Sequence, residues 1–200
     1  MNKLFTINNK ELHDINTTIL ITSKTKYNND IIELINNGCE VITKDSNNSI
    51  SDLSLEILEN FNCMYLKNKN DITKIDEIKI NILSTLISNK KNIVFINVLT
   101  YVDNEFKRKL IKELKKQDKR IINYTSEIEE TLLLDYLLVL RDTEIIMEGL
   151  TKEILKEEKI LKKLGFNLPF IVELSNGLQY YRLINKTHYV SESLVNTLWK

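Results

Sequence analysis

Short apolar runs rich in isoleucine, leucine and valine recur along this chain and alternate with stretches of helical periodicity. The clearest run is Ile93-Val-Phe-Ile96, which contains no polar residue and follows Asn92. A continuous apolar run of this length is typical of a strand that is buried on both faces of a parallel sheet. Strands that alternate with helices predict an α/β fold with a mostly parallel sheet.

The same periodicity divides the whole chain into expected elements. Strands are expected over residues 18–22, 40–43, 63–66, 92–97, 120–124, 136–140 and 143–148. Helices are expected over residues 28–36, 51–58, 75–88, 104–117, 127–134, 152–164, 169–181 and 191–199. Since the last helices follow the last strand, we expect a sheet-containing core over 1–150 and a C-terminal helical extension over 151–200.

The charge balance excludes some classes of partner. Lys plus Arg and Asp plus Glu each number 28, so the formal net charge is zero. Without an excess of positive charge, general nucleic-acid or anionic-membrane binding is not expected, although a local basic patch is possible. No apolar run reaches the ~18 residues of a transmembrane helix, and the start lacks the form of a signal peptide. We expect a cytoplasmic protein whose membrane contact, if any, is peripheral.

Side chains that bind metals are few. Cys39 and Cys63 are far apart in the sequence, and His13 and His188 do not cluster with them. A zinc site needs more ligands in closer groups, so we expect reduced thiols and no metal site. The chain has only 4 glycines, which are too few for a loop that wraps phosphates with its backbone.

The C-terminal quarter carries the most specific motifs. Gly149-Leu-Thr-Lys-Glu-Ile-Leu155 is similar to the Gly-Thr-Pro-Lys-Glu-Ile-Phe step that ends many ATP-binding-cassette domains. Leu164-Gly-Phe-Asn-Leu-Pro-Phe-Ile-Val-Glu-Leu-Ser175 resembles the C-terminal extension of the energy-coupling-factor ATPases, which drive uptake of vitamins and of cobalt or nickel. The end of the chain, residues 191–200, fits the closing helix of that family.

Upstream segments follow the same family in order. Ile93–Ile96 lies where the Walker B strand is expected, and Arg120-Ile-Ile-Asn-Tyr-Thr125 matches the next strand of the cassette. Residues 38–45 and 55–57 resemble two further family motifs, and residues 18–35 can be laid over the phosphate-loop strand and helix. The resemblance implies a P-loop-NTPase-like fold, a mostly parallel sheet flanked by helices, with ATP and Mg²⁺ as the family's ligands.

The phosphate loop is the first family motif that this sequence lacks. A Gly-x-x-Gly-x-Gly-Lys-Ser/Thr loop closes backbone N–H groups on phosphate oxygens. The matching stretch, residues 22–30, has no glycine. Tyr27 replaces the last glycine, Asn28 replaces the lysine, and Asp30 adds negative charge. Lys24 and Lys26 are interpreted as solvated surface lysines.

The catalytic positions are also replaced. Asn97 stands at the Walker B aspartate that orders Mg²⁺, Val98 at the glutamate that polarises water, and Ser126 at the switch histidine. Residues 73–77 match the signature motif but contain no glycine, and Asp76 and Glu77 are expected near phosphate, where they would repel it. We therefore predict no catalytic, cofactor-binding or metal-binding residues in this chain.

The expected strand at 63–66 would end at Leu66, where the family has a glutamine. The family then has a helical subdomain before the signature helix, and here almost nothing separates Asp71 from Thr73. We expect a reduced helical subdomain. Since that subdomain helps to form the groove for the membrane subunit, ordinary transporter docking is in question.

Three other groups of residues have both a functional and a structural interpretation. Glu129 and Glu130 resemble an acid pair, but a helix start on a solvated face is the preferred interpretation. The Lys-rich helix over 107–119 is also expected to be a solvated face. The aromatic residues Tyr180, Tyr181 and Trp199 either form a patch for a partner or, as we prefer, pack the tail against the core.

The retained scaffold and the replaced chemistry favour a non-catalytic cassette homologue. Its expected partner is an intact homologue in a heterodimer, with an integral membrane transporter subunit as a further possible partner and no nucleic acid. The alternative is an ATPase half of a heterodimeric transporter module that keeps weak ATP binding or hydrolysis. A third possibility is a decayed gene product, or one recruited to a new binding role.

Overall fold

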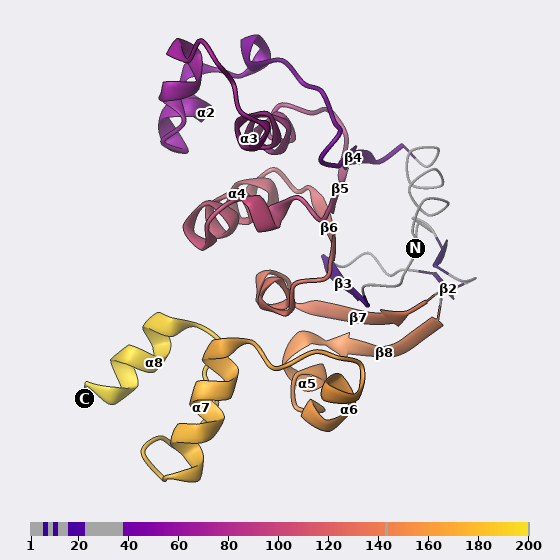
Figure 1. The fold of residues 1–200 in the computed structure, drawn as a ribbon, viewed down its shortest axis with the longest axis vertical. Helices are drawn as coiled ribbons and strands as arrows, with labels where there is room; N and C mark the ends of the chain where they lie inside the picture. Colours follow the sequence, from indigo (N-terminus) through magenta and orange to yellow (C-terminus); the bar gives the residue numbers. More distant parts are fainter. Residues whose placement is uncertain (1–5, 8–9, 12–15, 23–37, 143, 200) are drawn as a thin grey trace.

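The computed structural model describes residues 6–7, 10–11, 16–22, 38–142 and 144–199. The helix expected over 28–36 lies outside the described residues. A two-stranded antiparallel pair, β1 (Thr6–Ile7) and β2 (Lys10–Glu11), precedes the main sheet. The main sheet is six-stranded, with helices packed along it (Figure 1).

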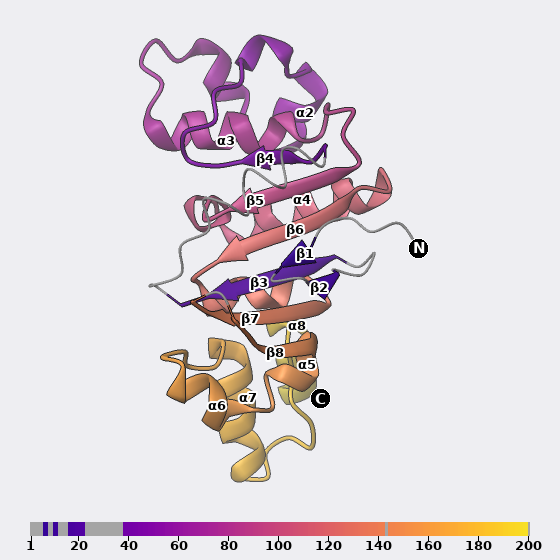
Figure 2. The ribbon, with the colours of Figure 1, turned by 90° about the vertical axis from the view of Figure 1, so that its right-hand side faces the viewer.

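The strand order of the main sheet is β4-β5-β6-β3-β7-β8, as Figure 2 shows. The strand bounds are Thr17–Ile21 for β3, Glu40–Ile42 for β4, Asn92–Ile96 for β5, Arg120–Thr125 for β6, Tyr136–Arg141 for β7 and Glu144–Leu150 for β8. All neighbouring pairs are parallel except β7 and β8, which are antiparallel. The prediction of an α/β fold with a mostly parallel sheet is confirmed.

Strand β5 is buried on both faces, as its apolar run predicts. Ile93 and Phe95 belong to the cluster beneath the helices, whereas Val94 and Ile96 belong to a second cluster on the other face. Successive side chains of a strand point to opposite faces, so a continuous apolar run supplies both clusters.

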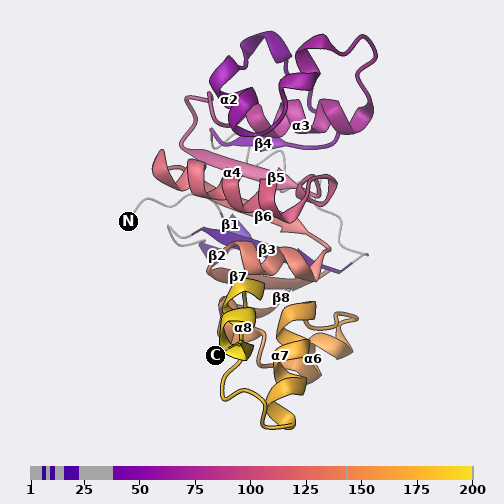
Figure 3. The ribbon, with the colours of Figure 1, turned by 90° about the vertical axis from the view of Figure 1, so that its left-hand side faces the viewer.

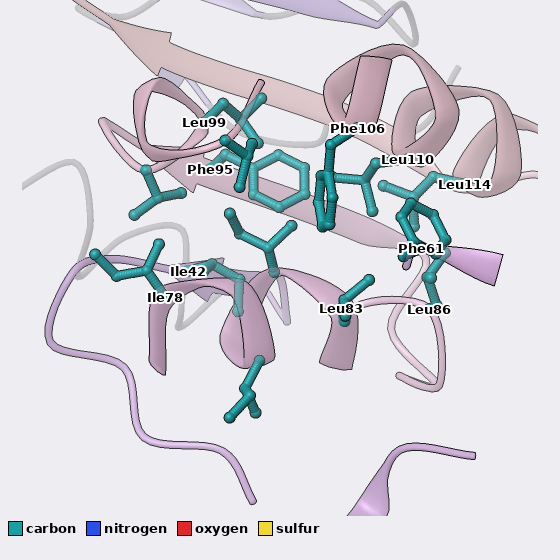
Figure 4. Packing of buried hydrophobic residues seen from close by; sticks show 14 of the residues in the cluster. Ile42, Phe61, Ile78, Leu83, Leu86, Phe95, Leu99, Phe106, Leu110 and Leu114 are labelled. Atoms are coloured by element: carbon teal, nitrogen blue, oxygen red, sulfur yellow. The ribbon is translucent and has the colours of Figure 1, made fainter. Parts of the chain in front are cut away.

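Three helices cover the face of the sheet at β4, β5 and β6 (Figures 1 and 3). They are α2 (Leu55–Asn60), α3 (Lys74–Ser84) and α4 (Asn104–Lys116). Short 3₁₀ helices lie between the longer elements: η1 (Ile50–Asp52), η2 (Met64–Asn68), η3 (Leu99–Tyr101) and η4 (Ile128–Leu133). Figure 4 shows Phe95 of β5 in the core between these helices, near Phe106 of α4. The rings of Phe61 and Phe106 have centroids 5.0 Å apart.

The strand expected over residues 63–66 is wrong, because this segment is the 3₁₀ helix η2. Asn62 has a positive φ of 55° and turns the chain back, and the Cys63 N–H donates to Leu58 O at 2.7 Å. Cys63 and Leu66 are both buried. Residues three apart eclipse in a 3₁₀ helix, so this spacing buries both side chains without a strand.

The helical segment between the sheet and α3 is longer than the sequence suggested. Strand β4 lies beside β5 and is followed by residues 43–73, which contain η1, α2 and η2. Leu66 is therefore buried in η2 and does not follow a strand, so its assignment to the family glutamine is wrong. The helix expected over 51–58 begins later, because Ser54 caps α2 through a bond from the Ile57 N–H.

The last four helices lie at the end of the sheet opposite α2 and α3 (Figures 1 and 2). They are α5 (Thr151–Ile154), α6 (Glu158–Lys163), α7 (Phe170–Tyr180) and α8 (Ser191–Leu198), so the single helix expected over 152–164 is in fact two. One apolar cluster joins Leu20 and Val139 of the sheet to Leu161, Val172 and Leu194 of these helices. Within the described part of the chain, no helix is long and apolar enough to cross a membrane.

Candidate functional site

The carboxyl ends of β3, β5 and β6 meet at one edge of the sheet. Ile96 pairs with Tyr124, and Leu20 pairs with Thr125, so Asn97 and Ser126 follow neighbouring strands. This edge is where ligands bind in open α/β sheets. The sequence-based assignment of Asn97 and Ser126 to one site therefore agrees with the topology.

Asn97 ties the end of β5 to the end of β6. Its N–H donates to Tyr124 O at 2.9 Å, and its Oδ1 accepts a hydrogen bond from the Ser126 N–H at 3.2 Å. Its φ is +50°, a left-handed conformation that asparagine adopts more readily than most residues. The side chain that the resemblance assigns to the Walker B position is thus a neutral amide, and it bonds to the backbone of Ser126.

The Val98 side chain does not reach this edge of the sheet. Its side chain is 0% exposed and belongs to the apolar cluster that contains Phe95, Leu99 and Phe106. A group that activates a water molecule must reach that water with a hydrogen-bonding atom. The position that the resemblance assigns to the catalytic glutamate therefore contributes only packing.

Two hydroxyl residues follow one another at the end of β6. Thr125 is buried, and its Oγ1 accepts from the Glu127 N–H at 3.0 Å, while Ser126 is exposed. Thr22 extends the ladder of β3 by donating from its N–H to Leu140 O at 3.3 Å. The other phosphate-loop positions, Lys24, Lys26, Tyr27, Asn28 and Asp30, lie outside the described residues.

The segment that matches the signature motif begins helix α3, as expected. Thr73 and Asp76 form a capping box: the Asp76 carboxylate accepts from the Thr73 N–H at 3.0 Å and from the Thr73 hydroxyl at 2.6 Å. The Tyr65 hydroxyl donates to the same carboxylate at 3.1 Å, and Lys69 forms an ion pair with it.

These partners change the interpretation of Asp76. Its side chain is nearly excluded from solvent, at 4% exposure, and its charge is compensated within the chain. Burial opposes ionisation, but the hydrogen bonds from Lys69, Thr73 and Tyr65 outweigh it and hold the pKa of Asp76 well below its usual range. The structure thus gives Asp76 a capping role at α3, and the expectation that it lies near phosphate and repels it stays a prediction. Glu77 is exposed and pairs with Lys74 at 3.0 Å.

The described side chains at the ends of β5 and β6 do not fit a Mg²⁺–ATP hydrolysis site. Mg²⁺ is held by carboxylates and phosphates with several waters, whereas Asn97 offers an amide oxygen already bonded to Ser126. Water activation needs a base, and Val98 is a buried aliphatic residue. Asn97 and Val98 hold the backbone and the core in place, but they supply neither a carboxylate for Mg²⁺ nor a base for water activation.

Two residues that the sequence suggested were solvated form a buried ion pair instead. Lys107 Nζ lies 3.0 Å from Glu130 Oε1, and Glu130 Oε2 accepts from Asn123 Nδ2 at 2.9 Å. The solvated-face interpretation is wrong for both Lys107 and Glu130. A signal was present, because Lys107 is three residues before Leu110 and seven before Leu114, on the apolar face of α4.

Glu129 has a separate role from Glu130. It is exposed, and its Oε1 accepts from the Phe170 N–H, the first residue of α7, at 2.6 Å. A carboxylate at a helix start bonds a free N–H and is favoured by the helix dipole. Glu129 and Glu130 are therefore not a catalytic acid pair.

Three aromatic residues near the C-terminus are exposed. Tyr180, Tyr181 and Trp199 are 82%, 73% and 85% exposed, so the preferred interpretation that they pack the tail against the core is wrong. The two tyrosine rings contact each other edge to face, with centroids 5.3 Å apart. Packing of the extension relies on aliphatic residues such as Val172 and Leu194.

Comparison with solved structures identifies the class of fold. The structure of a bacterial Atm1-family ABC exporter with ATP bound matches with a TM-score of 0.60, over 76% of this chain and 36% of that chain. Sequence identity is 9%, so the likeness concerns the fold alone. Together with the strand order, it shows an ATP-binding-cassette type of NTPase fold.

Curated relatives narrow the class further. The energy-coupling factor transporter ATP-binding protein EcfA1 of Mycoplasmopsis synoviae is 30% identical over 129 residues, which is 61% of this chain and 46% of that protein. The protein of the same name from Mesomycoplasma hyopneumoniae is 31% identical over 126 residues, 61% of this chain and 45% of that protein. This chain thus spans less than half the length of these relatives. No protein-family model matches it. The relatives support a relationship to the energy-coupling-factor branch of ABC transporters.

Proposed function

We propose that this chain is a subunit of an energy-coupling-factor type ABC transporter that does not hydrolyse ATP and acts as a structural or regulatory partner in uptake of vitamins or metal ions. The single observation that supports this most is the burial of Val98 in the apolar core at the position of the family's catalytic glutamate. The bond from the Ser126 N–H to Asn97 Oδ1 adds that the switch and Walker B positions are engaged with each other.

The proposed partner is an intact cassette homologue, and the complex would sit at the inner face of the membrane through an integral subunit. The division into a core over 1–150 and an extension over 151–200 belongs to this proposal. The extension offers exposed apolar side chains at Tyr181 and Trp199, which suits a surface that is covered in a complex.

The first test is calorimetric titration of the purified full chain with ATP and Mg²⁺. We expect no binding below about 1 mM, equivalent to a binding free energy weaker than about −4 kcal/mol. Micromolar, Mg²⁺-dependent binding would contradict the proposal.

The second test is co-expression with an intact energy-coupling-factor ATP-binding protein, followed by co-purification and phosphate release. Replacing the intact partner's catalytic glutamate by glutamine should remove all turnover, and Asn97→Ala with Ser126→Ala in this chain should leave turnover unchanged. Turnover that survives in the inactivated partner and depends on Asn97 would favour the alternative, an ATPase half that retains weak activity.

A further inference from the structure

A cleft of about 500 Å³ lies between α4 and η4. Helix α4 lies across the helical face of the sheet, as Figure 3 shows. The cleft is lined by three aliphatic and four cationic residues: Ile111, Leu132, Leu133, Arg108, Lys112, Lys115 and Lys116. The aliphatic side chains are buried or half-buried and the cationic ones are exposed, so the cleft has an apolar floor and a basic rim.

The four cations form a row along one flank of α4. Arg108, Lys112, Lys115 and Lys116 are spaced i, i+4, i+7 and i+8, which places them on one side of the helix over about 12 Å. Like charges one turn apart destabilise a helix unless opposite charges compensate them. The four cations therefore repel one another, and an anionic ligand would reduce this repulsion.

Compensation within the chain is partial. Lys115 lies 3.4 Å from Asp135, and Lys116 lies 2.8 Å from Glu113, both in solvent-exposed pairs that contribute little. Within the residues that the structure describes, Arg108 and Lys112 form no ion pair. The two cations at the N-terminal half of the row are thus available for a ligand.

We propose that this cleft binds an acidic amphipathic helix of a partner protein, with aliphatic side chains on the Ile111–Leu132–Leu133 floor and carboxylates on Arg108 and Lys112. Carboxylates four residues apart on a ligand helix are separated by one turn, as Arg108 and Lys112 are. The planar guanidinium of Arg108 suits bidentate binding of a carboxylate. An amphipathic helix in a groove is a recurring mode of recognition.

Other anionic ligands fit this cleft less well. A nucleic-acid surface for single strands needs aromatic side chains on which bases stack, and the floor here is aliphatic. A membrane surface is bound by apolar side chains that protrude, whereas Ile111 is buried and Leu132 and Leu133 are half-buried in a hollow. The combination of an aliphatic hollow with flanking cations matches an acidic peptide.

Fluorescence anisotropy with a labelled helical peptide of about 14 residues tests this inference. The probe carries leucines on one face and glutamates on both flanks, and the full-length chain is the titrant. We expect a Kd on the order of 10–100 µM, suited to a small interface. Arg108→Glu with Lys112→Glu should weaken binding at least tenfold.

The matched control is Lys159→Glu with Lys163→Glu. These lysines are also exposed, one helical turn apart, and without an ion pair in the described chain. The control should bind the probe as the unmodified chain does. A probe with serines in place of leucines should bind at least tenfold more weakly, which checks the floor without any change to the protein.

Three results with the peptide probes would overturn the inference. They are the absence of binding by the unmodified chain at about 1 mM, equal loss in both double variants, and equal binding of the serine probe. Circular dichroism melts accompany the variants. If Arg108→Glu with Lys112→Glu does not fold, two measurements on the unmodified chain test the inference instead. They are the binding of the serine probe and the salt dependence of binding of the leucine probe. Binding of anionic vesicles or duplex DNA as tightly as the peptide would also count against a peptide site.

Discussion

The ammonium group of Lys107 lies 3.0 Å from Glu130 Oε1 with both side chains almost completely buried, so α4 and η4 are joined by an ion pair beneath the protein surface. Asn123 of β6 completes the arrangement by donating to Glu130 Oε2. The pair thus connects a helix, a 3₁₀ helix and a central strand. It also explains why a glutamate and a lysine can occupy an otherwise apolar layer.

Removing one partner of the Lys107–Glu130 ion pair should lower the free energy of unfolding more than replacing both partners. Glu130→Ala leaves the Lys107 ammonium buried without a counter-charge, and we expect the free energy of unfolding to fall by about 3–5 kcal/mol. Lys107→Met combined with Glu130→Gln removes both charges and keeps an acceptor for Asn123, so the loss should be smaller. Urea denaturation of Glu130→Ala, of Lys107→Met and Glu130→Gln each alone, and of the double variant measures this. Additive losses in the double variant would contradict a direct pair.

The capping carboxylate of α3 should make stability depend on pH. The folded pKa of Asp76 is lowered, so its contribution is complete above the unfolded pKa of about 3.9 and is lost as the pH falls through the folded value. Asp76→Asn should lower the free energy of unfolding by about 1.5–3 kcal/mol at pH 7. This difference from the unmodified chain should shrink steadily below about pH 4. A difference that is constant from pH 7 to pH 2.5 would show that the charge is not involved.

Introducing the family's catalytic residues at positions 97 and 98 should not increase ATP hydrolysis. Val98→Glu places a carboxylate in the apolar core, and we expect a loss of at least about 3 kcal/mol of stability with no gain in phosphate release. Asn97→Asp is the matched control, because aspartate tolerates the same backbone and can still accept from the Ser126 N–H. It should change stability by less than about 1 kcal/mol. Thermal melts and a phosphate-release assay check both variants.

The extension should be held by its buried aliphatic residues and not by its exposed aromatic residues. Trp199→Ala and Tyr181→Ala remove exposed side chains, so each should change the free energy of unfolding by no more than about 0.5 kcal/mol. Leu194→Ala empties a buried position in the cluster shared with the sheet and should cost about 2–5 kcal/mol. Denaturant titrations compare the three. A large loss for Trp199→Ala would mean that its ring packs against the chain.

The sheet could be predicted from the sequence because buried strands leave a local signature. Ile93–Ile96 needs apolar residues at every position, since both faces of β5 are covered. The run at 63–66 is equally short, and such runs do not distinguish a strand from a helical segment. The positive φ of Asn62 and the bond from the Cys63 N–H to Leu58 O selected the helical turn.

The replaced chemistry at the cassette positions stays a prediction that rests on residue type, because residue type sets whether a side chain carries a charge or can accept a proton. Asn97, Val98 and Ser126 carry neither a carboxylate nor an imidazole in any conformation. Where the side chains point could not be predicted. The burial of Val98, and the bond to Asn97 Oδ1 from the Ser126 N–H, depend on strands that are distant in the sequence.

The sequence by itself determined the α/β pattern and the mostly parallel sheet, because these follow from local periodicity. Only the tertiary structure decided which charges are buried and which aromatic residues are exposed. Glu130 and Trp199 are opposite examples, a charged residue at 1% exposure and an aromatic residue at 85%. Burial is set by the elements that pack around a residue, and its neighbours in sequence do not specify them.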